Sequence, residues 1–483
     1  MKVRILDIST GGIKVVVLND EDASKLNLYA LDRIRIRKDK KSVVAILDIS
    51  DGMVRKGELG VFKEVSDFLK LKNKDKVKIE YVEKPKSIYY IKEKLDGGVL
   101  NKEEINEIVK DVIHDKLNEI EIAYFISGCY KYGLDLEEVS NLTKAIVDIS
   151  RKLNLNKKVI VDKHSSGGIP GNRTSMIIVP ILAAAGLVIP KTSSKAITSP
   201  SGTADTMGVF SNVEFTVKEI EKIVKKTNGC LVWGGTKELA SADDKLIKIE
   251  RPLSLDPEGI MLASIMSKKF SVGAKYLLID IPVGRNAKVK SMKRAMHLKN
   301  KFINLGKKLG IKVRVMISDG RQPIGNGVGP VLEAKDVLRV LKNDGVEDLK
   351  NKSVEMAGMI FEMVGYKNGR KKALEILESG KAYEKFKEIV EMQKGKIRDI
   401  KLSDIKYNFR SKKKGKIVSI DNNIVNRVCR ILGCPREKEA GIYFNFKIGG
   451  KVEKGDKLFI VYAKDKKKLK ESLSLLNGIV VIN

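Results

Sequence analysis

The sequence of 483 residues predicts an α/β protein made of an N-terminal β domain, a helical lobe, a large mixed α/β sheet domain and a C-terminal α+β domain. Apolar and polar residues alternate at the start of the chain, and apolar residues then recur at helical spacing. Further on, short apolar strands alternate with helical runs. The apolar share of 43% is enough to fill several cores.

Residues 1–84 are expected to form a β-barrel-like domain, because segments such as Arg33–Arg37 alternate in β fashion and glycine pairs mark turns. Residues 85–155 are expected to form the helical lobe, joined by residues from about 236 to 272. In this lobe Asn101 is followed by two glutamates, which is typical of the start of a helix.

Residues 156–404 are expected to form the α/β sheet domain, in which helices cover parallel strands and ligands bind at the carboxyl ends of those strands. The expected strands lie near residues 159–162, 186–190, 230–233, 276–279 and 313–317. Residues 405–483 return to β character at 416–420 and 457–461, and they are expected to form a structural α+β domain.

Composition excludes several classes of protein. The four cysteines include no Cys-x-x-Cys pair and only three histidines occur, so neither a zinc or other metal site nor a disulfide scaffold is expected. The chain begins with a charged, alternating segment and has no apolar run of about 18 residues. We therefore expect a cytoplasmic protein without a signal peptide or a membrane partner.

The net charge of +32 has three explanations: nucleic-acid binding, anionic substrates, or the lysine-rich surface of a heat-adapted protein. Charged residues make up 32% of the chain and glutamine occurs only at 322 and 393, which favours the last two explanations. The basic runs near the end of the chain have little aromatic interleaving, so nucleic acid is not expected as a partner.

The first candidate site is a loop of 13 residues that follows an apolar run and reads Lys-His-Ser-Ser-Gly-Gly-Ile-Pro-Gly-Asn-Arg-Thr-Ser from Lys163. A helix is predicted over Met176–Ala185, so the N–H groups of its first turn and the positive end of its dipole should point at the loop. Lys163 adds a full charge, and short hydroxyl donors follow at Ser165, Ser166, Thr174 and Ser175. The loop is therefore expected to hold an anion.

A second strand, loop and helix repeat this arrangement about thirty residues later, with Lys-Thr-Ser-Ser-Lys-Ala-Ile-Thr-Ser-Pro-Ser-Gly-Thr-Ala-Asp from Lys191. Two such loops favour a ligand with more than one phosphate group. Neither loop is a Walker A sequence or has dinucleotide-fold glycine spacing. The alternative is an ordinary glycine-rich turn, and Asp256, taken alone before a proline, is more typical of a helix cap or turn.

Four ordered motifs resemble the thymidine phosphorylase family: Lys-His-Ser-Ser-Gly-Gly from Lys163, Ser-Gly-Thr-Ala-Asp from Ser201, Ala-Ser-Ile-Met-Ser-Lys-Lys from Ala263 and Ser-Asp-Gly-Arg-Gln-Pro-Ile-Gly from Ser318. The resemblance covers roughly residues 86–483 and implies a sheet domain of the nucleoside phosphorylase and phosphoribosyltransferase type. The archaeal branch of the family, the AMP phosphorylases, has an additional N-terminal domain of this kind, and the whole chain resembles that branch.

The resemblance implies phosphorolysis, in which inorganic phosphate displaces a base from ribose C1′, with no cofactor. Catalysis of this kind depends mainly on orientation and electrostatics. His164 matches the active-site histidine of the family. The residues that the resemblance implies for the nucleophilic phosphate are Lys163, Ser165, Ser175, Ser193 and Thr203.

The departing base must be neutralised by a proton, and the resemblance makes Asp256 the candidate acid. An aspartic acid that works near neutral pH needs a raised pKa, which apolar surroundings at Leu253, Leu255 and Pro257 are expected to supply.

Substrate identity depends on departures from the pyrimidine enzymes. Their base-binding serine and lysine remain as Ser264 and Lys268, but Ile249 stands where an arginine is expected. The second loop has additional hydroxyl groups and a lysine, which suit the 5′-phosphate of a nucleotide. By resemblance the AMP contacts are Gly168, Ser194, Lys195, Ala196, Ile197, Thr198, Ser199, Thr203, Ser264 and Lys288.

Arg173 is a further candidate for the 5′-phosphate, although without the family it and Lys288 would be read as exposed cations. The favoured function is phosphorolysis of AMP, with CMP and UMP as additional substrates, in a homodimer or larger homo-oligomer whose lobes close around the substrate. The alternatives are a thymidine or uridine phosphorylase, a metal-dependent phosphoribosyltransferase, whose Asp-Glu pair is not evident, and a nucleic-acid binding module.

Overall fold

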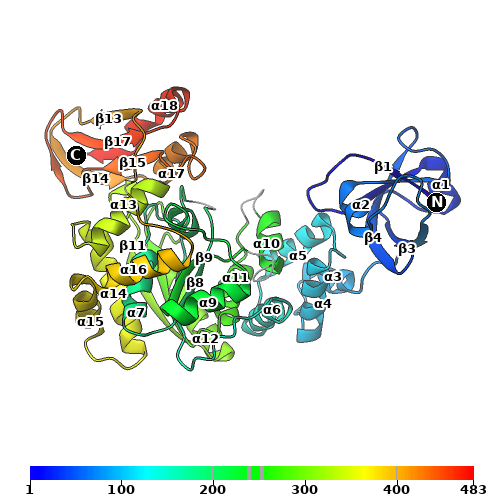
Figure 1. The fold of residues 1–483 in the computed structure, drawn as a ribbon, viewed down its shortest axis with the longest axis horizontal. Coiled ribbons are helices and arrows are strands. Elements are labelled where there is room, and N and C mark those ends of the chain that lie inside the picture. The colour runs from blue at the N-terminus through cyan, green and yellow to red at the C-terminus, as the bar shows by residue number, and fades with distance from the viewer. Residues whose placement is uncertain (197–198, 236–240, 251–254, 399) are drawn as a thin grey trace. The chain divides into compact units, whose positions relative to one another are not determined.

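The computed structural model divides the chain into two compact units. The residues that the structure describes are 1–196, 199–235, 241–250, 255–398 and 400–483. The first unit consists of Met1–Gly133 and Lys245–Leu255, and the second consists of Leu134–Asp244 and Asp256–Asn483. Figure 1 shows the ribbon from the N-terminal β domain in blue to the C-terminal domain in red.

The first unit begins with a six-stranded sheet in the order β1-β5-β2-β4-β3-β6. Its strands are β1 Lys2–Ile5, β2 Val15–Asn19, β3 Arg33–Lys38, β4 Lys41–Ser50, β5 Glu58–Val61 and β6 Lys78–Tyr81, with helices α1 Asp20–Lys25 and α2 Lys63–Leu69. Met1 and Val77 exchange two backbone hydrogen bonds, of 2.7 and 3.0 Å, and Lys2 forms a bridge with Lys76. These contacts connect the two edges of the sheet, so the β domain is closed like a barrel, around the apolar side chains of alternate positions such as Ile34 and Ile36.

Helices follow in the same unit: α3 Ser87–Leu95, α4 Lys102–Ile113 and α5 Glu119–Tyr132. The predicted helix start at Asn101 is confirmed, because the Asn101 side chain accepts from the Glu104 N–H and the Glu104 carboxylate accepts in return. Lys245, in helix α10 (Ser241–Glu250), donates to the carboxylate of Asp115 at 2.6 Å and to two carbonyl groups at the end of α4.

The second unit contains the predicted parallel sheet. Strands β11, β10 and β7 pair in this order, β8 pairs with β9, and a bridge between Ile160 and Val188 connects the two groups. The strands are β7 Val161–Ser165, β8 Ile189–Ser193, β9 Gly229–Trp233, β10 Tyr276–Val283 and β11 Lys312–Asp319. The helices are α6 Leu136–Ile149, α7 Ser175–Ala184, α8 Thr203–Met207, α9 Val217–Thr227, α11 Glu258–Ser271, α12 Met292–Leu309, α13 Pro330–Leu341, α14 Glu347–Met363, α15 Gly369–Glu378 and α16 Lys381–Met392.

The α/β fold class is confirmed, but two element boundaries around the first helix of the sheet domain differ from the prediction. Helix α7 begins at Ser175, and the strand expected at 186–190 begins only at Ile189. The reason is the helix end: Leu187 N–H donates back to Leu182, and Gly186 adopts a positive φ of 84°. Residues 186 and 187 therefore close the helix, which is apolar on every side and lies in the core.

The C-terminal domain is confirmed as α+β. Its strands are β13 Lys406–Arg410, β14 Gly415–Ile420, β15 Gly441–Phe444, β16 Lys451–Val452, β17 Lys457–Tyr462 and β18 Val480–Ile482, and its helices are α17 Asn422–Ile431 and α18 Lys466–Ser472. A short strand that the sequence did not predict, β12 Gly327–Val328, pairs with β15. The C-terminal sheet thus continues into the chain that precedes α13.

The loop before β12 is held from both sides. Lys447 donates to the carbonyls of Pro323 and Gly325, and Asn422 donates to the Gly320 carbonyl at 3.0 Å. On the other side, Ile324 N–H donates to the Pro170 carbonyl at 3.1 Å. The C-terminal domain is thereby connected to the loop that contains Pro170.

Asp336, on α13, fixes the turn that leads into β12. Its Oδ2 accepts from the N–H groups of Asn326 at 2.6 Å and Gly327 at 2.7 Å, whereas its buried Oδ1 has no hydrogen-bond partner among the described residues. Burial raises the pKa of Asp336 to about 6, against the effect of these two N–H groups.

This carboxyl group gives stability a pH dependence. Because the folded-state pKa is raised from 3.8 to about 6, the stabilising effect of protonation is full below about pH 4 and is lost as pH rises through 6. We expect Asp336→Asn to remove a loss of about 3 kcal/mol in unfolding free energy that develops between about pH 3 and pH 7. Denaturant unfolding at several pH values checks this, with exposed Asp344→Asn as the control. An unchanged pH profile in Asp336→Asn would contradict it.

Candidate active site

Strand β7 places candidate residues on both faces of the sheet, because side chains alternate along a strand. Lys163 and Ser165 share one face, and Asp162 and His164 share the other. The sequence treated Lys163, His164 and Ser165 as members of one loop, whereas the structure places them in the last residues of a strand.

On the first face, Lys163 meets the start of α7. Its ammonium group is buried and donates to Thr174 Oγ1 at 2.8 Å and to Ser175 Oγ at 3.3 Å. Burial lowers the pKa of Lys163 to about 7, against the attraction of Asp280. The structure thus brings Lys163 and Ser175 together, around a cation that has no carboxylate in direct contact among the described residues.

The predicted helix-end amides are only partly available. The N–H groups of Met176 and Ile177 donate to the carbonyls of Arg173 and Thr174, so they are already satisfied. Ser166 offers another donor, because its buried hydroxyl oxygen has no partner among the residues described by the structure. An anion in this loop would therefore be bound mainly by side chains.

Ser165 leads to an aspartate that the sequence analysis missed. Its hydroxyl group donates to Asp280 Oδ2 at 2.9 Å, and Asn172 donates to Ser165 at 3.2 Å. Asp280 is fully buried on β10, and a charged residue inside the apolar run Leu277–Ile281 was the signal that could have revealed it.

On the opposite face, His164 lies among cations. Burial lowers the pKa of His164 well below its usual value, and the charges of Lys269 and Lys191 lower it further. The imidazole is therefore neutral near pH 7 and can act as a hydrogen-bonding group. Asp162 offsets part of this positive charge: it lies fully buried, 2.6 Å from Lys269 and 3.9 Å from Lys191.

Helix α11 contributes Ser264 and Lys268 to the same side. The two residues are four apart, so they share one face of the helix, and both are half-buried. The charge of Lys268 also lowers the pKa of His164, which places the α11 face near the imidazole.

The second loop is closed by Asp205. The Asp205 Oδ2 atom accepts from the N–H groups of Ala196 at 2.6 Å and Gly202 at 2.8 Å, so it connects the two ends of the loop. Ser194 accepts from the Ala204 N–H at 3.4 Å. Two of the predicted AMP contacts, Ile197 and Thr198, lie outside the described residues.

The other predicted residues of this loop have protein partners in this structure. Ser193 donates to the Val232 carbonyl at 3.2 Å and Ser199 donates to the Ser201 carbonyl at 2.7 Å. Lys195 donates to Glu214 at 2.6 Å, with its ammonium 4.2 Å from the centre of the Trp233 ring. This ion pair is exposed, so Lys195 can exchange Glu214 for an anionic ligand at little cost.

Arg173, the further candidate for the 5′-phosphate, connects the two loops and is buried. The buried guanidinium group donates to the Thr203 hydroxyl at 3.1 Å, to the Ser201 carbonyl at 2.5 Å and to the Glu333 carboxylate. The alternative interpretation of Arg173 as an exposed cation fails, because its contacts with Glu333 and the second loop span long stretches of chain that local patterns do not reveal.

Gly168, Lys288 and Asp256 come together from three separate segments. A Cβ atom at Gly168 would lie 3.0 Å from the Lys288 nitrogen, and the φ of Gly168 is 89°, so a side chain there is disfavoured. The Lys288 ammonium lies 2.6 Å from Asp256 Oδ2. These contacts support the grouping of the three residues that the sequence predicted.

The surroundings of Asp256 differ from the expected ones. Its side chain is 43% exposed and paired with Lys288, whereas apolar neighbours were expected. Leu253, one of those neighbours, lies outside the described residues. The helix begins after Pro257 without a side-chain cap, so Asp256 is not the helix cap of the alternative interpretation either. An acid role would require the carboxyl group to leave this ion pair and enter a drier site.

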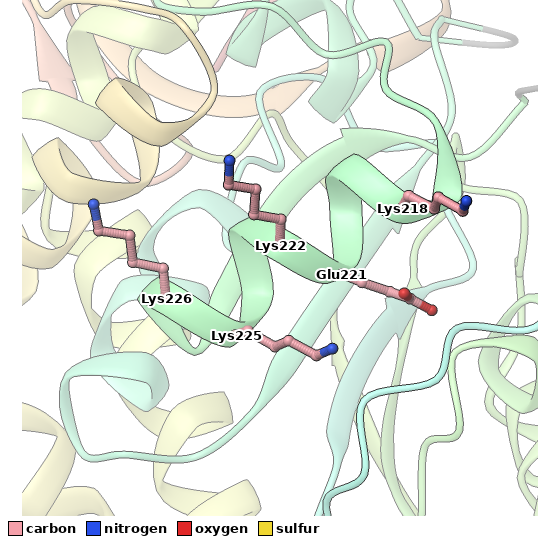
Figure 2. Close-up of a pocket in the computed structure, with 5 residues that line it drawn as sticks. All are labelled: Lys218, Glu221, Lys222, Lys225 and Lys226. Atoms are coloured by element: carbon pink, nitrogen blue, oxygen red, sulfur yellow. The ribbon is translucent and has the colours of Figure 1, made fainter.

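A hollow on the outer side of α9 is lined by Lys218, Glu221, Lys222, Lys225 and Lys226. Figure 2 shows these side chains projecting from successive turns of one helix in several directions. None of the predicted site residues lines it. This hollow therefore represents the general lysine-rich surface.

Within the described parts of the chain, no group of three or more His, Cys, Asp or Glu side chains is arranged to hold a metal ion. No helix in these parts is both long and apolar enough to cross a membrane.

Three family descriptions match the chain. Residues 88–150 match the helical bundle domain of the glycosyl transferase family, and residues 157–383 match the a/b domain of that family. Residues 416–483 match the C-terminal domain of pyrimidine nucleoside phosphorylases.

Full-length relatives share more than two fifths of their residues with the chain. AMP phosphorylases from Thermococcus kodakarensis and Pyrococcus furiosus are each 44% identical, over 98% of this chain and 95% of theirs. The AMP phosphorylase from Methanococcus vannielii is 41% identical over 100% of this chain and 97% of its own.

Among solved structures, the chain is similar in fold to anthranilate phosphoribosyltransferase from Thermus thermophilus, with a TM-score of 0.55 at 17% identity. That comparison covers 63% of this chain and 99% of the other. The corresponding enzyme from Saccharomyces cerevisiae gives a TM-score of 0.52 at 14% identity, over 64% of this chain and 98% of the other. At this identity the similarity shows the fold alone.

The buried pair of Arg173 and Glu333 yields a prediction. Arg173→Met leaves the Glu333 carboxylate buried without its cation, so we expect a loss of about 3–5 kcal/mol in unfolding free energy. The double variant Arg173→Met with Glu333→Gln should regain much of that stability in denaturant unfolding, but not the contacts to Thr203 and Ser201. If the double variant is no more stable than Arg173→Met, the ion pair is not the source of the loss.

Proposed function

We propose that this chain, which belongs to the family of AMP phosphorylases, converts AMP and inorganic phosphate to adenine and ribose 1,5-bisphosphate. Its glycosyl transferase domains make it a pentosyltransferase. CMP and UMP are proposed as further substrates. The observation that carries this proposal is the pair of anion loops joined by Arg173, because two fixed loops suit a substrate phosphate and a nucleophilic phosphate.

The nucleophilic phosphate is proposed to bind at Lys163, Ser165, Ser175, Ser193 and Thr203. Among the residues that the structure describes, Lys163 has hydroxyl partners but no carboxylate in direct contact, so an incoming phosphate would supply its counter-charge. Arg173 holds Thr203 in place from the side. A phosphate fixed by several donors is aligned for attack on C1′, which replaces rotational freedom with a defined geometry. Phosphate is a co-substrate in this scheme, and no cofactor is proposed.

The 5′-phosphate of AMP is proposed to bind the second loop, from Ser194 to Ser199, with Thr203, Gly168 and Lys288 beside it. The exposed pairing of Lys195 with Glu214 leaves that cation free to turn towards a dianion. Gly168 allows the close approach of the Lys288 backbone.

The base and ribose are proposed to lie between the second face of β7 and α11. Neutral His164 provides a hydrogen bond without adding a charge, and Ser264 lies on the neighbouring face of α11. Asp256 is the proposed proton donor to the departing base, once it separates from Lys288.

A nucleoside phosphorylase specific for thymidine or uridine is the second candidate, because Ser264 and Lys268 occupy the positions of its base-binding residues. Both functions use one nucleophile site, and only the 5′-phosphate separates them. We further propose that the enzyme acts in the cytoplasm as a homodimer or larger homo-oligomer.

The test of function is phosphate-dependent release of free base from AMP, CMP, UMP, adenosine and thymidine, measured side by side. Release from the nucleotides only is the expected result, and it would place the 5′-phosphate in the recognition step. Release from thymidine or uridine only would retain the nucleophile site and overturn the proposed substrate.

Asp256→Asn tests the proton donor. The amide keeps the shape of the carboxyl group but cannot protonate the base, so we expect kcat to fall by about 100-fold or more with AMP binding nearly unchanged. The matched control is Glu258→Gln, which removes the same charge two residues further on, where Glu258 pairs with Arg294 and His297. Steady-state kinetics together with calorimetric AMP binding separate the two effects. Full turnover in Asp256→Asn would exclude the acid role.

A further inference from the structure

Asp280 is the centre of a buried polar cluster beneath the proposed phosphate site. Its Oδ2 atom accepts from Ser165 at 2.9 Å and lies 2.9 Å from the Lys352 ammonium, and its Oδ1 atom accepts from Ser318 at 2.6 Å. Lys352, on α14, also donates to Ser318 at 3.0 Å. The Lys352 side chain is only 9% exposed and the Asp280 side chain is fully buried.

The charges that face Lys163 come from several elements. Asp280 on β10 and Asp162 on β7 favour its protonated form, whereas Lys352 on α14 and Arg173 before α7 oppose it. Two of these charges are locally balanced: Lys352 is paired with Asp280, and Arg173 is paired with Glu333. Lys163 is therefore left as the cation that an incoming anion meets on this face.

Without Lys352, the Asp280 carboxylate would repel a bound oxyanion and compete for Lys163. Asp280 is needed all the same, because it fixes the Ser165 hydroxyl group, and a buried carboxylate needs a cation to offset its desolvation. Lys352, which reaches Asp280 from α14, prevents the repulsion of the oxyanion and offsets the desolvation of the carboxylate. It cancels the negative charge and leaves Ser165 in place.

We propose that Lys352 is a positioning residue of the phosphate site, which neutralises Asp280 so that Asp280 can hold Ser165 without repelling the oxyanion bound by Lys163. This inference rests on the proposed function only for the identity of the anion. The inference needs only that an oxyanion binds at Lys163, whichever base the enzyme releases.

The two partners of this pair have opposite effects on Lys163. Removing the Lys352 charge leaves Asp280 unbalanced, so the pKa of Lys163 should rise from about 7. Removing the Asp280 charge leaves Lys352 unbalanced, so the pKa of Lys163 should fall. Oxyanion binding requires protonated Lys163, and it should therefore weaken with rising pH around a midpoint that moves in these two directions.

The experiment measures binding of sulfate to the full chain by calorimetry from pH 5.5 to 9.5, because sulfate keeps a constant charge over this range. Lys352→Met is expected to bind sulfate about tenfold more weakly at low pH, with the midpoint raised by about one pH unit. Asp280→Asn is expected to lower the midpoint. Lys352→Arg keeps the charge and should retain the wild-type midpoint.

Lys350→Met is the matched control, because Lys350 lies on the same helix and pairs with Glu378 at 3.3 Å. It should leave sulfate binding unchanged. Midpoints that stay fixed, or that move in the same direction in Lys352→Met and Asp280→Asn, would overturn the inference. If Asp280→Asn does not fold, the contrast between Lys352→Met and Lys352→Arg decides alone.

Failure of the proposed function gives a different result. A chain that binds sulfate with the expected midpoints but releases no base from AMP would contradict the function and leave the role of Lys352 intact. Normal release of adenine with an unchanged midpoint in Lys352→Met would support the function and contradict the role of Lys352.

Discussion

Burial of charge on the two faces of β7 is the constraint on which the candidate site depends. Strand β7 pairs with β10 on one side and is connected to β8 by a bridge on the other. Its charged side chains are therefore buried, and each one needs a partner from another element. Asp162 offsets part of the positive charge near His164, and Asp280 offsets positive charge on the face of Lys163. On that face, the charge that remains is that of Lys163 itself, whose partners are hydroxyl groups. An anionic reactant can complete this arrangement.

The same constraint explains how the two loops, which start about thirty residues apart along the chain, are held beside each other. Arg173 leaves the first loop, crosses to the second and ends on Glu333 of α13, which also accepts from Thr206. A buried guanidinium group with three fixed acceptors has little freedom to move. The spacing between the loops is therefore set by covalent geometry and ion pairing.

Local patterns predicted the elements and the loops well, because strand periodicity, glycine content and hydroxyl donors are read within a few residues. The pairs that define the electrostatics escaped prediction, since Asp280 with Lys352 and Arg173 with Glu333 are far apart along the chain. The apolar surroundings expected for Asp256 failed for a related reason: its neighbours in sequence do not enclose it, and Lys288 reaches it instead. A positive φ at Gly186 likewise displaced one predicted strand.

The loop from Gly320 to Gly325 gives the C-terminal domain a role in the architecture of the candidate site. On one side, side chains of that domain donate hydrogen bonds to the backbone carbonyl groups of this loop. On the other side the loop packs against Gly171, where a Cβ atom would lie 2.1 Å from the Ile324 oxygen. The boundary between the two domains therefore does not lie at a single point in the chain. Recombination of such enzymes by domain exchange would have to transfer this loop, β12 and the C-terminal sheet as one block. A foreign domain would leave the loop from Gly320 to Gly325, which supports the loop from Lys163, without its hydrogen-bond donors.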